Sequence, residues 1–255
     1  MSDTPAPGWA VVAGGSGGIG KAISSALAAD RWNLVVAYRS RRDRAEETAA
    51  VVRDLGQEAI VKQVDLTKPD EAQMFASDVA GMVEVSGVVY AAGPHIPMDF
   101  IANISPEQFA GQIDADLKAS YNFIHPFIPA VRESKGAILA VVTPVIERFT
   151  RADLLSSAPK AGVQALIRGL AAEEGRYGVR ANAIGVGVVQ GEGLWTSLNA
   201  SGVFTEKGLS QALAAIPLGR FGNETDVGNA AQFLMSPRAG WITGQTLNVD
   251  GGYSV

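Results

Sequence analysis

Seven short apolar runs, rich in β-branched residues, alternate with longer segments of helical spacing along this 255-residue chain. Strands that are apolar on both faces and alternate with helices are typical of a parallel sheet covered on each side. The sequence therefore predicts an α/β protein with a doubly wound sheet. The expected strands are 9–13, 33–38, 58–64, 87–92, 136–142, 179–186 and 245–250.

No linker, repeat or low-complexity stretch divides the chain, so we expect a single domain over residues 1–255. One connection, at about 185–215, is unusually long. A connection of this length after a strand is either a substrate loop or lid, or plain coil. Its apolar residues Trp195, Leu198 and Phe204 would line a partly apolar pocket or only pack the loop down.

Composition excludes several classes of protein. A net charge of −5 argues against nucleic acid or an anionic membrane surface as the main partner. Without cysteine, and with two histidines, the chain lacks the ligands of a usual zinc centre, so no metal site is expected. The longest apolar stretches fall far short of the roughly 20 residues that span a bilayer. With no basic leader before an apolar run, we expect a cytoplasmic protein.

A glycine-rich turn follows the first expected strand and opens a helix, in the segment VVAGGSGGIGKAISSALA. That context raises a glycine motif above chance. Gly14 would make the tight turn, Gly18 would let a pyrophosphate approach the backbone, and Gly20 would let the helix pack closely on the sheet. The free N–H groups and the dipole at the start of the helix favour bound phosphates.

The spacing of Gly14, Gly18 and Gly20 resembles the short-chain dehydrogenase/reductase (SDR) family, as do segments 180–187 and 216–252. The likeness covers nearly the whole chain and is greatest to the 3-oxoacyl-carrier-protein reductase branch. It implies a single Rossmann-type domain of about seven parallel strands with helices on both faces. It also implies cofactor contacts at Gly14, Ser16, Gly17, Gly18, Ile19, Gly20, Arg39, Ser40, Asp65, Leu66, Ala92, Gly93, Lys160 and Gly187.

The end of the second strand favours NADP(H) over NAD(H). No acid stands near Tyr38 to accept a hydrogen bond from a ribose 2′-hydroxyl, whereas Arg39 and Ser40 offer groups that suit a 2′-phosphate. The alternative is a solvated basic turn. Asp65 matches the family carboxylate that accepts from the adenine amino group, although it would serve equally as a cap at the end of a strand.

Family members reduce carbonyls with a Ser and a Tyr-x-x-x-Lys pair. Alignment on GAILAVVT puts Thr143 at the Ser position, Ser156 at the Tyr position and Lys160 at the Lys position. Thr143 keeps a hydroxyl that would position the substrate oxygen. Ser156 does not replace a phenol, because an alcohol ionises near the value for water, about 15.7, rather than about 10. Its oxygen would also end on the order of 4 Å short.

Two further positions depart from the family pattern. The usual Asn-Asn-Ala-Gly is replaced by Tyr90-Ala91-Ala92-Gly93, and the helix Asn that supports a proton-relay water appears as Asp116. Asp116 would either pair with Lys160, which would contact the ribose, or lie solvated. His95 is a candidate proton donor because imidazole titrates in the useful range, or it is merely structural or exposed. His125 is expected in the core or in an interface.

The first hypothesis for function is an NADP(H)-dependent oxidoreductase acting on a ketone or 3-oxoacyl thioester through Thr143, Lys160 and an unidentified acid or water. The alternative is a catalytically inactive subunit that serves assembly or regulation. A lyase or isomerase step in the same pocket is a third, unspecified reading. Because family members assemble through two helices, we expect a homotetramer or dimer, or a hetero-oligomer with an active relative.

Overall fold

All seven expected strands form one parallel sheet. The structure, a computed structural model, describes residues 8–191, 195 and 205–255. The strand order is β3-β2-β1-β4-β5-β6-β9. The chain adds β2 and β3 on one side of β1 and the later strands, from β4 onwards, on its other side, so the strand order reverses between β1 and β4. The strands are β1 (Trp9–Ala13), β2 (Asn33–Tyr38), β3 (Ala59–Gln63), β4 (Val85–Tyr90), β5 (Ala137–Val142), β6 (Arg180–Val186) and β9 (Thr246–Val249).

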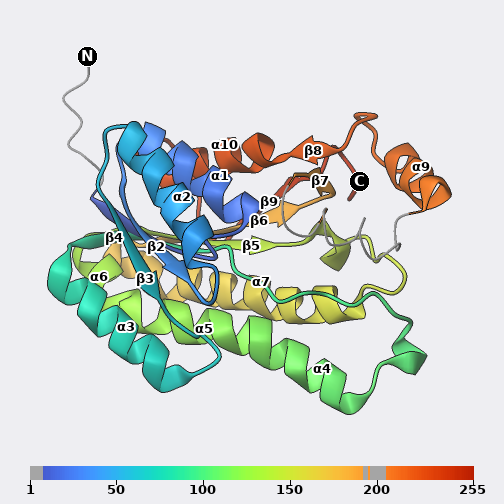
Figure 1. The fold of residues 1–255 in the computed structure, drawn as a ribbon, viewed down its shortest axis with the longest axis horizontal. Helices are drawn as coiled ribbons and strands as arrows, with labels where there is room; N and C mark the ends of the chain where they lie inside the picture. Colours follow the sequence, from blue (N-terminus) through green and yellow to red (C-terminus); the bar gives the residue numbers. More distant parts are fainter. Residues whose placement is uncertain (1–7, 192–194, 196–204) are drawn as a thin grey trace.

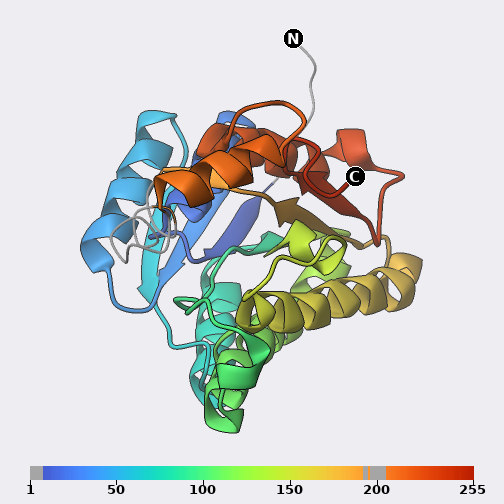
Figure 2. The same cartoon turned by 90° about the vertical axis from the view of Figure 1, so that its right-hand side faces the viewer.

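Helices cover both faces of this sheet, which confirms the doubly wound fold (Figure 1). One layer holds α1 (Gly18–Ala29), α2 (Arg42–Asp54) and α10 (Glu224–Met235), and its core includes Ile23, Val52 and Val227. The opposite layer holds α3 (Pro69–Met82), α5 (Ala119–Ile124), α6 (Ile128–Glu133) and α7 (Leu154–Glu174), and its core includes Phe75, Phe123 and Ile167. Figure 2 shows the sheet between the two layers.

The helical segment before α5 changes its winding. It begins as α4 (Pro106–Gln112), where Ser105 and Gln108 form a capping box, and continues through a π-helical stretch, η2 (Ile113–Lys118), into α5. Short 3₁₀ turns, η1 (Ile101–Asn103) and η3 (His125–Phe127), flank this run. A π turn within an α-helix is rare and is frequent at functional sites. Here the π turn carries Asp116.

The predicted loop at 185–215 lies only partly within the described residues. It contains β7 (Val189–Gln190), which pairs with β8 (Gly222–Asn223), and α9 (Glu206–Ala214). The ring of Trp195 packs against Phe221 with centroids 5.2 Å apart. Leu198 and Phe204 lie outside the described residues. The lid therefore stays a prediction.

The remaining described elements are three 3₁₀ turns near the sheet ends: η4 (Pro144–Ile146), η5 (Gly175–Tyr177) and η6 (Pro237–Ala239). None of the helices in the described part of the chain combines the length and the apolar character needed to traverse a bilayer.

Candidate active site

The glycine turn lies between β1 and α1, at the point where the strand order reverses. Gly14 has φ +78°, and a Cβ there would lie 2.6 Å from the carbonyl oxygen of Ala91. A Cβ on Gly20 would overlap the carbonyl of Gly14. From α2, the Thr48 hydroxyl donates to the Gly15 carbonyl at 2.7 Å. Only glycine fits at the two tight positions, and a neighbouring helix holds the turn in place.

A cavity of about 230 Å³ opens at the carboxyl ends of β1, β2 and β4. Open α/β sheets bind ligands in this place. Nine of the residues predicted to bind cofactor line it: Gly14, Ser16, Gly17, Arg39, Ser40, Asp65, Leu66, Ala92 and Gly93. Of the other predicted contacts, Gly18, Ile19 and Gly20 lie in the first turn of α1, and Gly187 packs on Asp250.

The cavity is lined by both a carboxylate, Asp65, and a guanidinium, Arg39. Asp65 Oδ1 accepts hydrogen bonds from the hydroxyl of Thr67 at 2.7 Å and from its backbone N–H at 3.1 Å. These bonds, the hydroxyl first, hold the pKa of Asp65 below its usual value, and the charges of Lys68 and Arg39 act in the same direction. Asp65 is therefore an anionic acceptor with Oδ2 left for a ligand. Asn122 of α5 fixes the neighbouring loop by donating to the Leu66 carbonyl at 2.9 Å.

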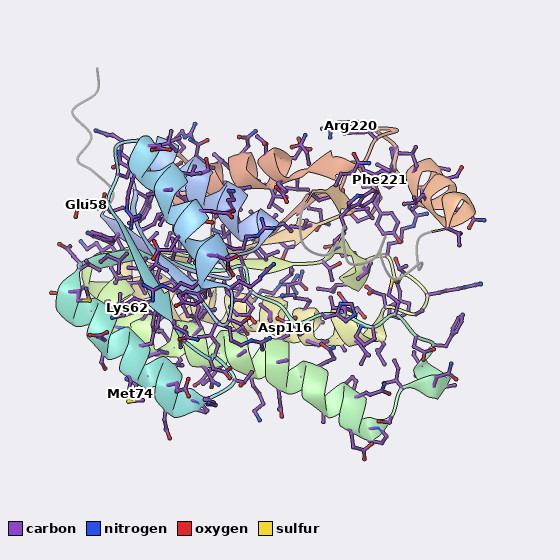
Figure 3. The ribbon with its side chains drawn as sticks, viewed as in Figure 1. Glu58, Lys62, Met74, Asp116, Arg220 and Phe221 are labelled. Carbon is purple, nitrogen blue, oxygen red and sulfur yellow. The ribbon has the colours of Figure 1, made fainter. Side chains whose placement is uncertain are left out.

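Lys160 lies beneath Gly93 and is paired with Asp116. Its Nζ is 2.9 Å from Asp116 Oδ1 and 3.4 Å from the Ala92 carbonyl, and the side chains are 10% and 3% exposed. Of the two alternatives for Asp116, the structure has the ion pair and not the solvated carboxylate. Figure 3 shows Asp116 on the helical run that lies beside α7. An ammonium has three donors, so one remains for a ligand.

Tyr90, at the end of β4, completes this network. Its hydroxyl lies 3.0 Å from the Asp116 carbonyl oxygen and 3.1 Å from Asp116 Oδ1, and Lys160 Nζ stands 5.2 Å from the centre of its ring. Burial, followed by the charge of Asp116, raises the pKa of Tyr90 well above that of an ordinary phenol. The side chain is fully buried. Tyr90 is thus a structural partner of Asp116 and a poor proton donor to a substrate.

Thr143 and Ser156 both lie near the carboxyl end of β5. Thr143 caps η4 by accepting from the Val145 N–H at 3.4 Å, which leaves its own O–H free to donate. Ser156 is 7% exposed in the first turn of α7, and its backbone N–H donates to the Asp153 carbonyl at 3.2 Å. Burial raises the pKa of Asp153 from 3.8 to about 6, against the opposing effect of the neighbouring Ser156 side chain.

Comparison with known proteins fits this geometry. Residues 13–254 match the family model described as enoyl-(acyl carrier protein) reductase. The chain is 31% identical over 245 residues to the 3-oxoacyl-[acyl-carrier-protein] reductase FabG of Aggregatibacter actinomycetemcomitans, covering 95% of this chain and 97% of that one. The FabG of Staphylococcus epidermidis is 29% identical over 244 residues, with the same coverage. This chain belongs to the SDR family.

A solved structure of a short chain dehydrogenase/reductase family protein supports the same assignment. It superposes with a TM-score of 0.83 and 29% identity, covering 97% of each chain. The SDR fold thus accounts for the sheet, the switch point and the position of Lys160.

Two histidines remain from the sequence predictions. His95 is exposed, and the Gln112 side chain donates to its backbone carbonyl at 2.9 Å, so its imidazole has no described link to Lys160. His125 is exposed too, with its ring stacked on Tyr121 at 5.0 Å. The expectation that His125 lies in the core is wrong, because its position on the helix turns outward. An interface at His125 stays a prediction.

Two residues that lie beside the predicted site in the structure are not predicted as participants from the sequence. Asp153 was not considered, although an acid one helical turn before Ser156 is visible in DLLSSAPK. From the sequence, Tyr90 is a departure from the family pattern and a phenol near the site, but its bond to Asp116 is not predicted. The sequence signal for this contact is a pair of changes, because Tyr90 and Asp116 each replace an asparagine of the family pattern. The fold brings these two residues to hydrogen-bond distance.

Proposed function

We propose that this SDR protein binds NADP(H) and reduces a ketone or a 3-oxoacyl thioester without a phenol at position 156. The observation that carries the proposal is the cavity at the strand ends, with a buried ammonium, Lys160, under its rim. The substrate class is that of the relatives, which are 3-oxoacyl-[acyl-carrier-protein] reductases. Localisation and oligomeric state stay predictions.

The residues present fit a nicotinamide dinucleotide. Glycines at positions 14 and 20 leave no side chain over the turn, and the backbone N–H groups at the start of α1 suit a diphosphate. Arg39 and Ser40 at the end of β2 suit a 2′-phosphate, and Asp65 offers an acceptor for an adenine amino group. When bound, the reduced cofactor supplies a hydride to the carbonyl carbon.

The chain's own side chains then have separate tasks. Thr143 donates its free O–H to the carbonyl oxygen and holds it in place. Lys160 donates its remaining N–H to a ribose hydroxyl, and Asp116 supplies the counter-charge of that ammonium within a buried setting. Because Ser156 is too short and too weakly acidic to act as a phenol does, the carbonyl oxygen needs another source for its proton.

Arg39→Ala should weaken NADPH binding about 10- to 100-fold and leave NADH binding unchanged. A charge-assisted hydrogen bond contributes roughly 1.5–3 kcal/mol, which corresponds to that range in dissociation constant. NADH lacks the 2′-phosphate that the guanidinium would contact. Calorimetric or fluorescence titration of both nucleotides into wild type and variant measures the effect.

Arg42→Ala is the matched control. Arg42 begins α2 three residues further on, pairs with Glu46 at 3.8 Å and does not line the cavity, so both affinities should stay as in wild type. Equal affinity of the wild type for NADPH and NADH would contradict the proposed preference. An equal loss for both nucleotides in Arg39→Ala would indicate a damaged site instead of a lost phosphate contact.

The second candidate is a catalytically inactive subunit for assembly or regulation. The network of Tyr90, Asp116 and Lys160 favours it, because these buried polar groups satisfy one another without substrate or cofactor. Such a core would persist with no selection for turnover. A wild-type protein that reduces an acetoacetyl thioester at an ordinary rate would eliminate this candidate.

A further inference from the structure

The hydroxyl of Thr48, on α2, is placed to fix the shape of the glycine turn. Thr48 is 1% exposed, and its Oγ1 lies 2.7 Å from the Gly15 carbonyl oxygen and 3.2 Å from the Arg44 carbonyl oxygen. A hydroxyl has one proton to donate, and the shorter distance assigns that proton to Gly15. No other donor in the described part of the chain reaches the Gly15 carbonyl. The direction of this carbonyl therefore depends on a side chain 33 residues further along the chain.

Gly15 faces away from the cavity, unlike its neighbours in the turn. A Cβ on Gly15 would lie 2.6 Å from the Val36 side chain, so this residue packs directly on β2. The other three residues of the turn, Gly14, Ser16 and Gly17, line the cavity. The Gly15 carbonyl is thus directed to α2, and the residue that follows it opens on the cavity.

The direction of the Gly15 carbonyl also sets the direction of the next N–H. The peptide unit that joins Gly15 to Ser16 is planar and trans, so its C=O and its N–H point in opposite directions. Because the carbonyl is directed to Thr48, the Ser16 N–H is directed away from α2, on the side of the cavity that Ser16 lines. This N–H makes no hydrogen bond within the described residues. It is therefore available to an anion in the cavity.

Helix α2 is a firm support for this contact. Three of its residues, Ala45, Ala49 and Val52, are fully buried in the core. The helix begins directly after the segment that holds Arg39 and Ser40, the two groups that suit a 2′-phosphate. One element thus follows the candidate 2′-phosphate groups at its start and holds the glycine turn through a later residue.

We propose that Thr48 is a positioning residue for the cofactor diphosphate, because its hydroxyl directs the Ser16 N–H into the cavity as a hydrogen-bond donor. This inference rests on the proposed cofactor binding. Thr48 is buried and does not line the cavity, so it acts through the turn and not by contact with the ligand. Without the hydroxyl, the Gly15 carbonyl loses its partner and nothing holds the Gly15–Ser16 peptide in this direction. NADPH and NADH have the same diphosphate, so both depend on Thr48 alike.

Thr48→Val should weaken the binding of NADPH and of NADH by the same factor, about 10-fold. Valine keeps the branched shape of threonine and removes the hydroxyl. The affinity for adenosine 2′-monophosphate should not change, because this probe has the 2′-phosphate and lacks the diphosphate. Thr48→Ala should give the same losses, and Thr48→Ser, which keeps the hydroxyl, should bind all three ligands as wild type does. Calorimetric titration measures these affinities.

Ser24→Ala is the matched control. Ser24 is a fully buried serine on α1, and its Oγ has no hydrogen-bond partner within the described residues. Its substitution removes a buried hydroxyl from the neighbouring helix without removing a described contact to the glycine turn. The affinities of Ser24→Ala for all three ligands should therefore equal those of wild type.

A second readout follows the donor itself. In protein labelled with ¹⁵N-serine, the backbone signal of Ser16 is identified by its loss in Ser16→Ala. The amide proton of Ser16 should shift downfield when NADPH is added to wild type, as expected for an N–H that donates to a charged oxygen. The shift should be smaller in Thr48→Val and should be complete in Thr48→Ser and Ser24→Ala.

The outcomes separate this inference from the proposed function. Wild type that binds both nucleotides while Thr48→Val binds them equally well overturns the inference and leaves cofactor binding standing. A loss confined to NADPH, or an equal loss for adenosine 2′-monophosphate, also overturns it, because either result places the effect outside the diphosphate. A Ser16 amide that does not respond to bound NADPH overturns it as well. Wild type that binds neither nucleotide overturns the proposed function, and this inference with it.

Discussion

Lys160→Met should lower the free energy of unfolding by about 3–5 kcal/mol at neutral pH. The substitution keeps the length of the side chain and removes its ammonium, so the carboxylate of Asp116 is left in a buried position without a counter-charge. Removing one partner of a buried pair is costly because the other partner stays desolvated. Urea unfolding of wild type and variant, followed by circular dichroism, measures the difference.

A second substitution tests the cause of that loss. Asp116→Leu combined with Lys160→Met removes the remaining charge, and Tyr90 keeps a partner because its hydroxyl also contacts the Asp116 backbone carbonyl at 3.0 Å. Stability should then return towards that of wild type. Lys68→Met, which breaks the exposed pair of Lys68 with Glu71, should leave stability nearly unchanged. A loss in Lys160→Met as small as in Lys68→Met would argue against a desolvated pair.

Asp153→Asn should raise the free energy of unfolding by about 2–3 kcal/mol above pH 7. The pKa of Asp153 is raised in the folded protein from 3.8 to about 6 by burial, so the folded state holds a proton that the unfolded chain releases. Stability therefore falls as pH rises from about 4 to 6, and the full loss persists above pH 6. Asparagine has the same shape and no charge to desolvate.

Urea unfolding at pH 4, 6 and 8 tests this sign. The gain from Asp153→Asn should be small at pH 4, where the wild-type carboxyl is mostly protonated in the folded state, and greatest at pH 8. Glu147→Gln should show no such trend, because Glu147 is exposed. A variant less stable than wild type at pH 8 would mean that the carboxylate is stabilised in the folded protein.

The strands could be predicted closely from sequence because each is apolar on both faces, a pattern that few other structures produce. β1 and β2 have the predicted bounds, and β4 begins two residues before the predicted start, at Val85. The pair of β7 with β8 was not predicted. Each of those strands has two residues, too few for any periodicity to show.

The site was predictable only where it depends on local chain geometry. The glycine turn follows from conformational limits that Gly14 meets within its own segment. The pairing of Lys160 with Asp116 links residues 44 apart, and the sequence left it open against a solvated carboxylate. The direction in which the Asp116 side chain points depends on the π turn, and no residue pattern in this segment predicts a π turn. Burial of Asp153 likewise arises from segments that meet only in the folded protein.

One carboxylate oxygen, Asp116 Oδ1, receives both the Tyr90 hydroxyl and the Lys160 ammonium. Changing Lys160 or Asp116 alone leaves the charge of the other without its partner in the interior. Mutations among these residues are therefore expected to be strongly epistatic. Evolution between this arrangement and one with two asparagines is easiest through paired substitutions. Engineering that restores a phenol at position 156 should accordingly begin from all three partners together.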